Sequence, residues 1–91
     1  KEISITATGG VRYTVPSTIN TAQMDDTVTV RFRVGAVYKN CYIAVYLDDK
    51  QLQHRKRPVM APGEMEQVVL KKKELIETEN PRTITIKIEE A

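Results

Sequence analysis

Several short runs of the sequence alternate between polar and apolar residues, and this alternation constrains the fold more than any other feature. The clearest run is residues 27–34, whose apolar members are Val28, Val30, Phe32 and Val34. Successive residues of a β-strand point to opposite faces of a sheet, so such a run predicts a strand with one buried face. The chain has 18 Val and Ile residues against 4 Leu, and 10 Thr besides. Because branching at Cβ suits a pleated sheet, composition and pattern together predict an all-β fold.

Seven segments of this kind are separated by turn residues. They are residues 2–8, 11–15, 27–34, 41–47, 51–57, 64–70 and 83–89. Residues 64–70 also have helical spacing, but the segment is short and Val68 and Val69 disfavour a helix, so we interpret it as a strand. The charges of residues 51–57 are typical of an edge strand. Seven short strands predict an antiparallel immunoglobulin-like sandwich.

Two connecting segments are polar. Residues 17–26 predict a loop in which Ile19 and Met24 are anchors, and residues 71–80 predict at most one helical turn, around Leu75 and Ile76. The inward faces of the strands predict one apolar core. Its expected members are Ile3, Ile5, Val11, Tyr13, Val28, Val30, Phe32, Ile43, Val45, Leu47, Ile84, Ile86 and Ile88.

The chain length of 91 residues fits a single domain spanning 1–91 with one modest core. Because the chain starts at Lys1 rather than at a methionine, we expect a domain taken from a larger protein. The only cysteine is Cys41, so no internal disulfide can form, which fits a reducing cytoplasm. No apolar run approaches the roughly 20 residues of a membrane-spanning helix, so we expect no association with a membrane.

The residue types that perform chemistry lie in unfavourable settings. The only histidine, His54, is followed directly by three cations at 55–57, which would repel a proton or a metal ion. Cys41 opens an apolar strand and reads as a small buried side chain. The acidic pairs at 25–26 and 48–49 fit turns, because neighbouring strand residues point apart. We therefore expect no catalytic, cofactor-binding or metal-binding residue in this chain, and no enzyme activity of its own.

The charge is nearly balanced, with 14 basic and 12 acidic residues and a net charge of +2. Basic residues do gather in three places, and aromatic residues lie near them. These are Arg31 and Arg33, residues 55–57 and residues 71–73, with Phe32, Tyr38, Tyr42 and Tyr46. Such a set could form a stacking groove for single-stranded nucleic acid. Acidic residues are interspersed throughout, however, so we do not expect nucleic-acid binding.

Three stretches carry a resemblance to a known family. They are Gly-Val-Arg-Tyr-Thr-Val-Pro at 10–16, Val34 followed by Val-Tyr-Lys-Asn at 37–40, and Arg-Pro-Val-Met-Ala-Pro-Gly-Glu-Met-Glu at 57–66. Together they resemble the C-terminal domain of FAD-dependent pyridine nucleotide-disulfide oxidoreductases of anaerobic Gram-positive bacteria. Those proteins look like relatives of anaerobic glycerol-3-phosphate dehydrogenases. The flavin and dinucleotide fingerprints and the redox cysteines of the family have no counterpart here, so no functional residue is carried over.

The resemblance implies a non-catalytic accessory or docking domain of a larger cytoplasmic flavoprotein. FAD would belong to the parent protein and not to this domain, and the partner would be the rest of the parent or a second copy of the domain. The alternative is a free-standing interaction module that binds single-stranded nucleic acid or a protein partner. Discriminating between the two requires the flanking sequence.

The expected interface is the outer face of strand 41–47, where Tyr42 and Tyr46 would point away from the core. Arg31 and Arg33 point outward from their own strand and would frame the same patch. The competing interpretation is that the tyrosines are covered by the N-terminal segment or by residues 71–80.

Overall fold

The computed structural model of the protein describes residues 2–77 and 81–90, and they are mostly in strands. The strands are β1 (Glu2–Ala7), β2 (Val11–Val15), β3 (Thr18–Asn20), β4 (Thr27–Val34), β5 (Tyr38–Leu47), β6 (Lys50–Met60), β7 (Glu66–Lys71) and β8 (Thr83–Glu90). One short helix, α1 (Lys72–Ile76), lies between β7 and β8. The predicted all-β class is therefore confirmed.

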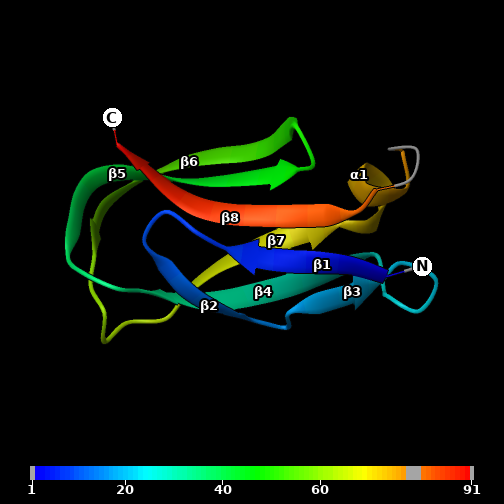
Figure 1. Cartoon of the computed structure of the whole chain (residues 1–91), viewed down its shortest axis with the longest axis horizontal. Coiled ribbons are helices and arrows are strands. Elements are labelled where there is room, and N and C mark those ends of the chain that lie inside the picture. Colours follow the sequence, from blue (N-terminus) through cyan, green and yellow to red (C-terminus); the bar gives the residue numbers. More distant parts are fainter. Residues whose placement is uncertain (1, 78–80, 91) are drawn as a thin grey trace.

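The strands form two sheets. The five-stranded sheet has the order β3-β1-β8-β5-β6, and the three-stranded sheet has the order β2-β4-β7. In Figure 1 the strands of both sheets run along the long axis of the molecule, with β5 and β6 on its upper side and β2 and β3 on its lower side. The chain changes sheet several times between β1 and β8, so the strands of the two sheets are interleaved along the sequence.

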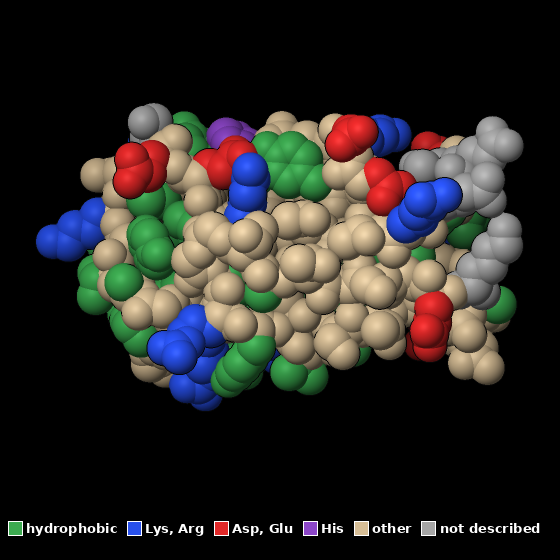
Figure 2. Space-filling model, viewed as in Figure 1, with side chains coloured by type: hydrophobic (Ala, Val, Ile, Leu, Met, Phe, Trp, Pro, Cys, Tyr) green, Lys and Arg blue, Asp and Glu red, His purple; other side chains and the backbone are tan. Residues whose placement is uncertain are grey.

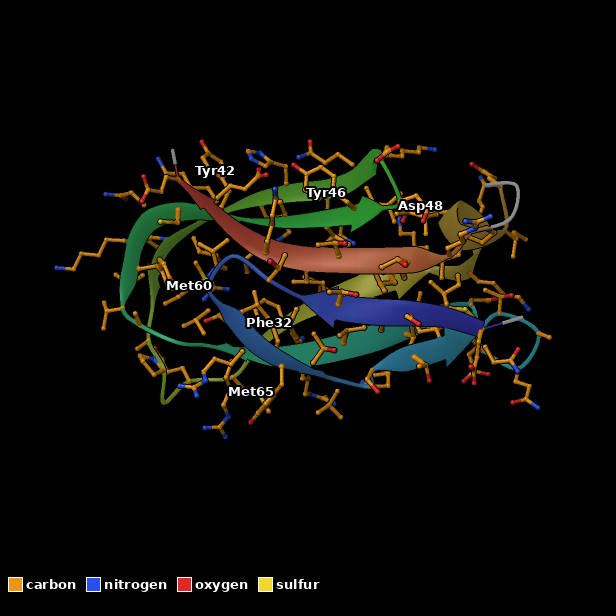
Figure 3. All side chains as sticks on the ribbon, viewed as in Figure 1. Phe32, Tyr42, Tyr46, Asp48, Met60 and Met65 are labelled. Atoms are coloured by element: carbon orange, nitrogen blue, oxygen red, sulfur yellow. The ribbon has the colours of Figure 1, made fainter. Side chains whose placement is uncertain are left out.

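One apolar core lies between the sheets and draws on every strand of both. Most of the predicted core residues are buried in it, and Val28 is half-buried against it. Phe32, on the central strand of the three-stranded sheet, is fully buried. Figure 3 shows Phe32 inside the molecule, with Tyr42 and Tyr46 near its upper edge and Met65 near its lower edge. The core also takes in Cys41, Ile19 and Val34, which were expected to be buried or to anchor a loop but were not among the predicted core residues. It further includes Met60, Val68, Leu70 and Leu75, whose burial was not predicted.

The prediction that Tyr13 belongs to the core is wrong, because its side chain is 46% exposed. The register between β2 and β4 shifts between Val11 and Tyr13, which marks a β-bulge. A bulge places an extra residue in one strand, so the alternation of its side chains reverses beyond that point. Thr14 consequently pairs with the buried Phe32, while Tyr13 pairs with Arg33 and points outward.

Three predictions about individual segments are confirmed. Residues 66–70 of the segment 64–70 lie in a strand, β7, and no part of the segment is a helix. Residues 51–57 lie in β6, at the edge of the five-stranded sheet. The helical turn is α1, which buries Leu75 and leaves Ile76 exposed. Residues 78–80 of that predicted segment lie outside the described residues.

Two predictions about connectivity are wrong. Residues 17–26 are not entirely a loop, because β3 pairs there with β1 and buries Ile19. The sheets are not wholly antiparallel either, since β1 runs parallel to β8. These two strands come from opposite ends of the sequence, so no hairpin dictates their relative direction. The finer prediction of immunoglobulin-like connectivity stays a prediction.

Candidate interaction surfaces

The outer face of the five-stranded sheet carries a connected group of polar and aromatic side chains. We call it the tyrosine face and define it by Tyr42, Tyr46, Gln51, His54, Lys87 and Glu89, from β5, β6 and β8. The side chains of Cys41, Ile43, Val45 and Leu47 on β5 are buried in the core. Since side chains alternate along a strand, Tyr42 and Tyr46 point to the opposite, outer side, as predicted.

Glu89 is the centre of the tyrosine face. The Tyr46 hydroxyl donates to Oε2 of Glu89 at 2.6 Å, and Gln51 Nε2 donates to the Tyr46 hydroxyl at 3.1 Å. Nε2 of His54 lies 3.4 Å from Oε1 of Glu89, and Nζ of Lys87 lies 3.3 Å from its Oε2. The carboxylate is thus surrounded by donors from all three strands.

The aromatic rings of this face are covered by their neighbours. Tyr42 stacks on His54, with 4.1 Å between ring centroids and 14° between ring planes. The ammonium of Lys87 lies 5.1 Å from the centroid of the Tyr46 ring. The side chains in these two contacts come from β6 and β8. Residues 78–80, part of one segment expected to cover the tyrosines, lie outside the described residues. Figure 2 shows the single histidine at the upper edge beside acidic, basic and hydrophobic side chains.

The ionisation of Tyr46 and Glu89 reflects this arrangement. The hydrogen bond to Glu89, followed by burial, raises the pKa of Tyr46 above its ordinary value. The hydrogen bond from Tyr46 lowers the pKa of Glu89, against a smaller opposing effect of burial, and Lys87 and His54 lower it further. A neutral phenol and an ionised carboxylate are the forms that this geometry stabilises. The polar groups of the tyrosine face thus satisfy one another within the chain.

The outer face of the three-stranded sheet is different in character. We call it the arginine face and define it by Tyr13, Val15, Arg31, Arg33, Met65, Gln67 and Val69. Tyr13 pairs with Arg33, and Arg31 lies between Val15 and Gln67 in the next row across the sheet. Met65 comes directly before β7, where Glu66 pairs with Phe32, so the same register places Met65 beside Arg33.

Four large apolar side chains are exposed on the arginine face. Val15 is 58% exposed, Met65 45% and Val69 40%, and Tyr13 is exposed to a similar extent. In Figure 2, hydrophobic side chains lie beside Lys and Arg side chains along the lower edge of the molecule, over β2. Aromatic residues, Met and Arg are the residue types that protein interfaces favour, so this face has the composition of an interface.

The cations of the arginine face have no acidic partner in the part of the chain that the structure describes. Neither Arg31 nor Arg33 takes part in an ion pair there, and Nε of Arg33 is buried without a hydrogen-bond partner. The single acidic residue of β2, β4 and β7 is Glu66. Its side chain is buried and lies 3.3 Å from Nη2 of Arg57 on β6. The outward positions of this sheet therefore carry positive charge alone.

The structure separates the residues that were expected to form one patch. Tyr42 and Tyr46 lie on the five-stranded sheet, whereas Arg31 and Arg33 lie on the three-stranded sheet. Because both pairs point away from the shared core, they face opposite sides of the molecule, and the prediction that the arginines frame the tyrosines is wrong. Tyr13 and Val15 were missed because the bulge in β2 reverses which of its side chains point outward. Met65 and Val69 were missed because their place beside β4 depends on the pairing of β7 with β4.

The remaining candidate residues have structural surroundings. Cys41 is buried, and its Sγ lies 3.4 Å from the carbonyl oxygen of Lys39. The carboxylate of Asp48 accepts hydrogen bonds from the backbone N–H groups of Arg82 and Thr83 at 3.3 and 3.1 Å. Within residues 2–77 and 81–90, no three His, Cys, Asp or Glu side chains are grouped to hold a metal ion. No helix among them is long and apolar enough to span a membrane.

Comparisons of the chain with protein-family models, with curated proteins and with solved structures found no match.

Proposed function

We propose that this chain is a non-catalytic docking domain of a larger, cytoplasmic FAD-dependent pyridine nucleotide-disulfide oxidoreductase. The observation that carries the docking role is the arginine face, which exposes four apolar side chains around two arginines that lack acidic partners among the described residues. The parent flavoprotein is what the resemblance implies. FAD and the redox chemistry belong to the rest of that protein, and this domain holds no cofactor.

The surroundings of the reactive residue types support a non-catalytic role. His54 and Glu89 approach each other to 3.4 Å, but they do so on the outer face of a sheet, where water reaches them. Catalytic electrostatics depend on a site that excludes water. The thiol of Cys41 is buried in the core, where a substrate would not reach it.

The strand orders support an immunoglobulin-like origin of the fold. In such domains one sheet contains strands A, B and E in that spatial order, and the other contains F, C and C′. The order β2-β4-β7 corresponds to the first set, and the order β8-β5-β6 to the second. The departure is β1, which occupies the place of strand G beside β8 but runs parallel to it. We propose that the chain is a variant of this sandwich in which an N-terminal strand takes the place of the last strand.

The second candidate function is binding of single-stranded nucleic acid. Tyr13 on the arginine face could stack on a base while Arg31 and Arg33 contact phosphates. The same face, however, presents Val15, Met65 and Val69, which suit a protein surface better than a polyanion.

The visible absorption spectrum of the natural full-length protein tests the proposed function. We expect flavin absorption bands in that protein and none in the isolated chain, even after FAD is added to it and excess FAD removed. A natural full-length protein without bound flavin would contradict the assignment to a flavoprotein. Flavin that stays on the isolated chain would contradict the non-catalytic, cofactor-free role.

A further inference from the structure

We propose that the arginine face is the surface by which this domain docks, and that the docked surface of the parent protein presents carboxylates among apolar side chains. This inference deepens the proposed function and rests on it for the identity of the partner. The tyrosine face, where an interface was first expected, then remains open to solvent.

Exposed apolar side chains flank the central strand of the arginine face. Tyr13 and Val15 project from β2, Val69 projects from β7, and Met65 lies just before β7, so exposed apolar side chains stand on both sides of β4. Between them on β4 stand Arg31 and Arg33. The result is a basic ridge with an apolar border on each side. A contiguous patch of this kind marks an interaction site more often than scattered apolar residues do.

The charges of Arg31 and Arg33 specify the chemistry of the partner. These arginines have no acidic neighbour on the outer face of their own sheet, because its single acidic residue, Glu66, is buried and pairs with Arg57. Nε of Arg33 is withdrawn from water without a partner in the described chain. A guanidinium presents donors in a fork that matches a carboxylate. A carboxylate from the partner would satisfy the donors that the chain leaves unpaired.

The spacing of the arginines restricts the partner further. Residues two apart on a strand lie about 7 Å apart on the same face. Two carboxylates at a similar separation occur at alternate positions of a strand, or one turn apart on a helix, where the rise is about 6 Å. The partner surface therefore needs a pair of acidic side chains with one of these spacings, flanked by apolar residues.

The same charges argue against a second copy of the chain as the occupant. A two-fold symmetric contact would bring the arginine faces of both copies together, since the same patch meets itself. Arg31 and Arg33 of the two copies would then repel each other. The tyrosine face is a weaker candidate for docking because Glu89 already pairs with Lys87 and lies beside His54.

Hydroxyl-radical footprinting with mass spectrometry tests the inference on unsubstituted protein. Tyr13 and Met65 report on the arginine face, and Tyr42 reports on the tyrosine face as an internal control. We expect labelling of Tyr13 and Met65 to fall several-fold from the isolated chain to the natural full-length protein, with Tyr42 unchanged. Equal labelling of Tyr13 and Met65 in the two proteins, or protection of Tyr42 instead, would overturn the inference.

Matched charge reversals test the role of the arginines. Arg31→Glu with Arg33→Glu in the natural protein should restore labelling of Met65 towards the level of the isolated chain. Lys50→Glu with Lys56→Glu makes the same change in net charge at exposed positions of β6 and should leave Met65 protected. Met65 could stay protected in the variant with both arginines replaced, or lose its protection equally in both variants. Either result would overturn the inference that the partner presents carboxylates.

The flavin spectrum and the footprint of the same sample separate this inference from the proposed function. Bound flavin without protection of Met65 overturns the docking face alone, whereas protection without flavin overturns the flavoprotein assignment alone. A natural protein with neither bound flavin nor protection of Met65 overturns both the proposed function and the docking face.

The last arm of the experiment adds a single-stranded oligonucleotide to the isolated chain. Salt-sensitive protection of Met65 by the oligonucleotide would favour nucleic acid over an acidic protein surface and overturn the inference.

Discussion

Glu89 stands at the point where three strands bring their polar side chains together. Its carboxylate accepts a hydrogen bond from Tyr46, lies beside His54 and pairs with the ammonium of Lys87. The polar side chains of the tyrosine face therefore contact one another through a single carboxylate, that of Glu89. The arginine face lacks such an acid among the described residues, and this difference is the basis of the proposal that it docks on a partner.

The first prediction concerns the ionisation of Glu89. The substitution Tyr46→Phe should raise the pKa of Glu89 towards its ordinary value, because the hydrogen bond from Tyr46 is the largest cause of its depression. Carboxyl chemical shifts followed by NMR during a pH titration measure this change. Gln51→Ala leaves the bond from Tyr46 to Glu89 in place and is the matched control. An unchanged pKa of Glu89 in the Tyr46→Phe chain would show that this bond is absent in solution.

The same two groups predict the pH dependence of the network. Because the folded pKa of Glu89 is depressed, its contribution to stability is complete above the ordinary pKa of glutamate and is lost as pH falls through the depressed value. The folded pKa of Tyr46 is raised, so its contribution is lost only as pH rises through that raised value. Between these limits, the free energies of unfolding of the chain and of the Tyr46→Phe variant should differ by a constant amount.

The second prediction concerns the centre of the core. Phe32 is fully buried between the sheets, so Phe32→Ala should lower the free energy of unfolding by about 3–5 kcal/mol. Ile76 on α1 is exposed, and Ile76→Ala should change it by no more than about 0.5 kcal/mol. Urea unfolding of the isolated chain measures both. Similar values for the two substitutions would contradict the position of the core.

Among the elements, β2 and β4 show what a sequence pattern can and cannot convey. Alternation in 27–34 correctly identified β4 and its buried face, because β4 runs without irregularity beside β7. Alternation in β2 misplaced Tyr13, because a bulge is set by the partner strand and leaves no mark on a run of alternating residues. The parallel pairing of β1 with β8 and the opposite placement of the tyrosines and arginines are likewise properties of strand pairing. Local patterns do not specify which strands pair.

The third prediction concerns the side of the molecule where β6 passes β7. Gln53 Nε2 donates to the carbonyl oxygen of Val69 at 2.7 Å, and Arg57 lies 3.3 Å from the buried Glu66, so β6 of one sheet contacts β7 of the other. Arg57→Leu should destabilise the chain by about 1–3 kcal/mol, because it leaves a buried carboxylate unpaired. Arg57 is partly exposed, so we expect a smaller loss of stability than breaking a fully buried ion pair would cause.

A double substitution separates this effect from simple loss of packing. When Glu66→Leu is combined with Arg57→Leu, no unpaired charge remains, and stability should recover most of the loss. Urea unfolding of the single and double variants completes the comparison. A double variant that is less stable than Arg57→Leu alone would show that the pair itself stabilises the fold.

At the scale of the whole molecule, two sheets enclose one core and leave two outer faces of opposite character. The tyrosine face satisfies its own polar groups, while the arginine face exposes apolar side chains and two arginines that pair with no acid among residues 2–77 and 81–90. Sequence alone placed most of the apolar core and predicted that Arg31 and Arg33 point outward. It could not place Met65 and Val69 beside them, because that requires knowing that β7 pairs with β4.

The central claim is that the arginine face is built for a partner and not for the fold of the chain itself. Thermal unfolding of the double variant Tyr13→Ser with Met65→Ser, in the isolated chain and in the natural full-length protein, tests this most directly. We predict little change in the isolated chain, where both side chains are exposed, and a clear loss of domain stability in the natural protein, where they are docked. The companion variant Tyr42→Ser with Tyr46→Ser should destabilise the isolated chain, because it dismantles the network around Glu89. Unfolding of the isolated chain by the first variant, or an unaltered natural protein, would contradict the account.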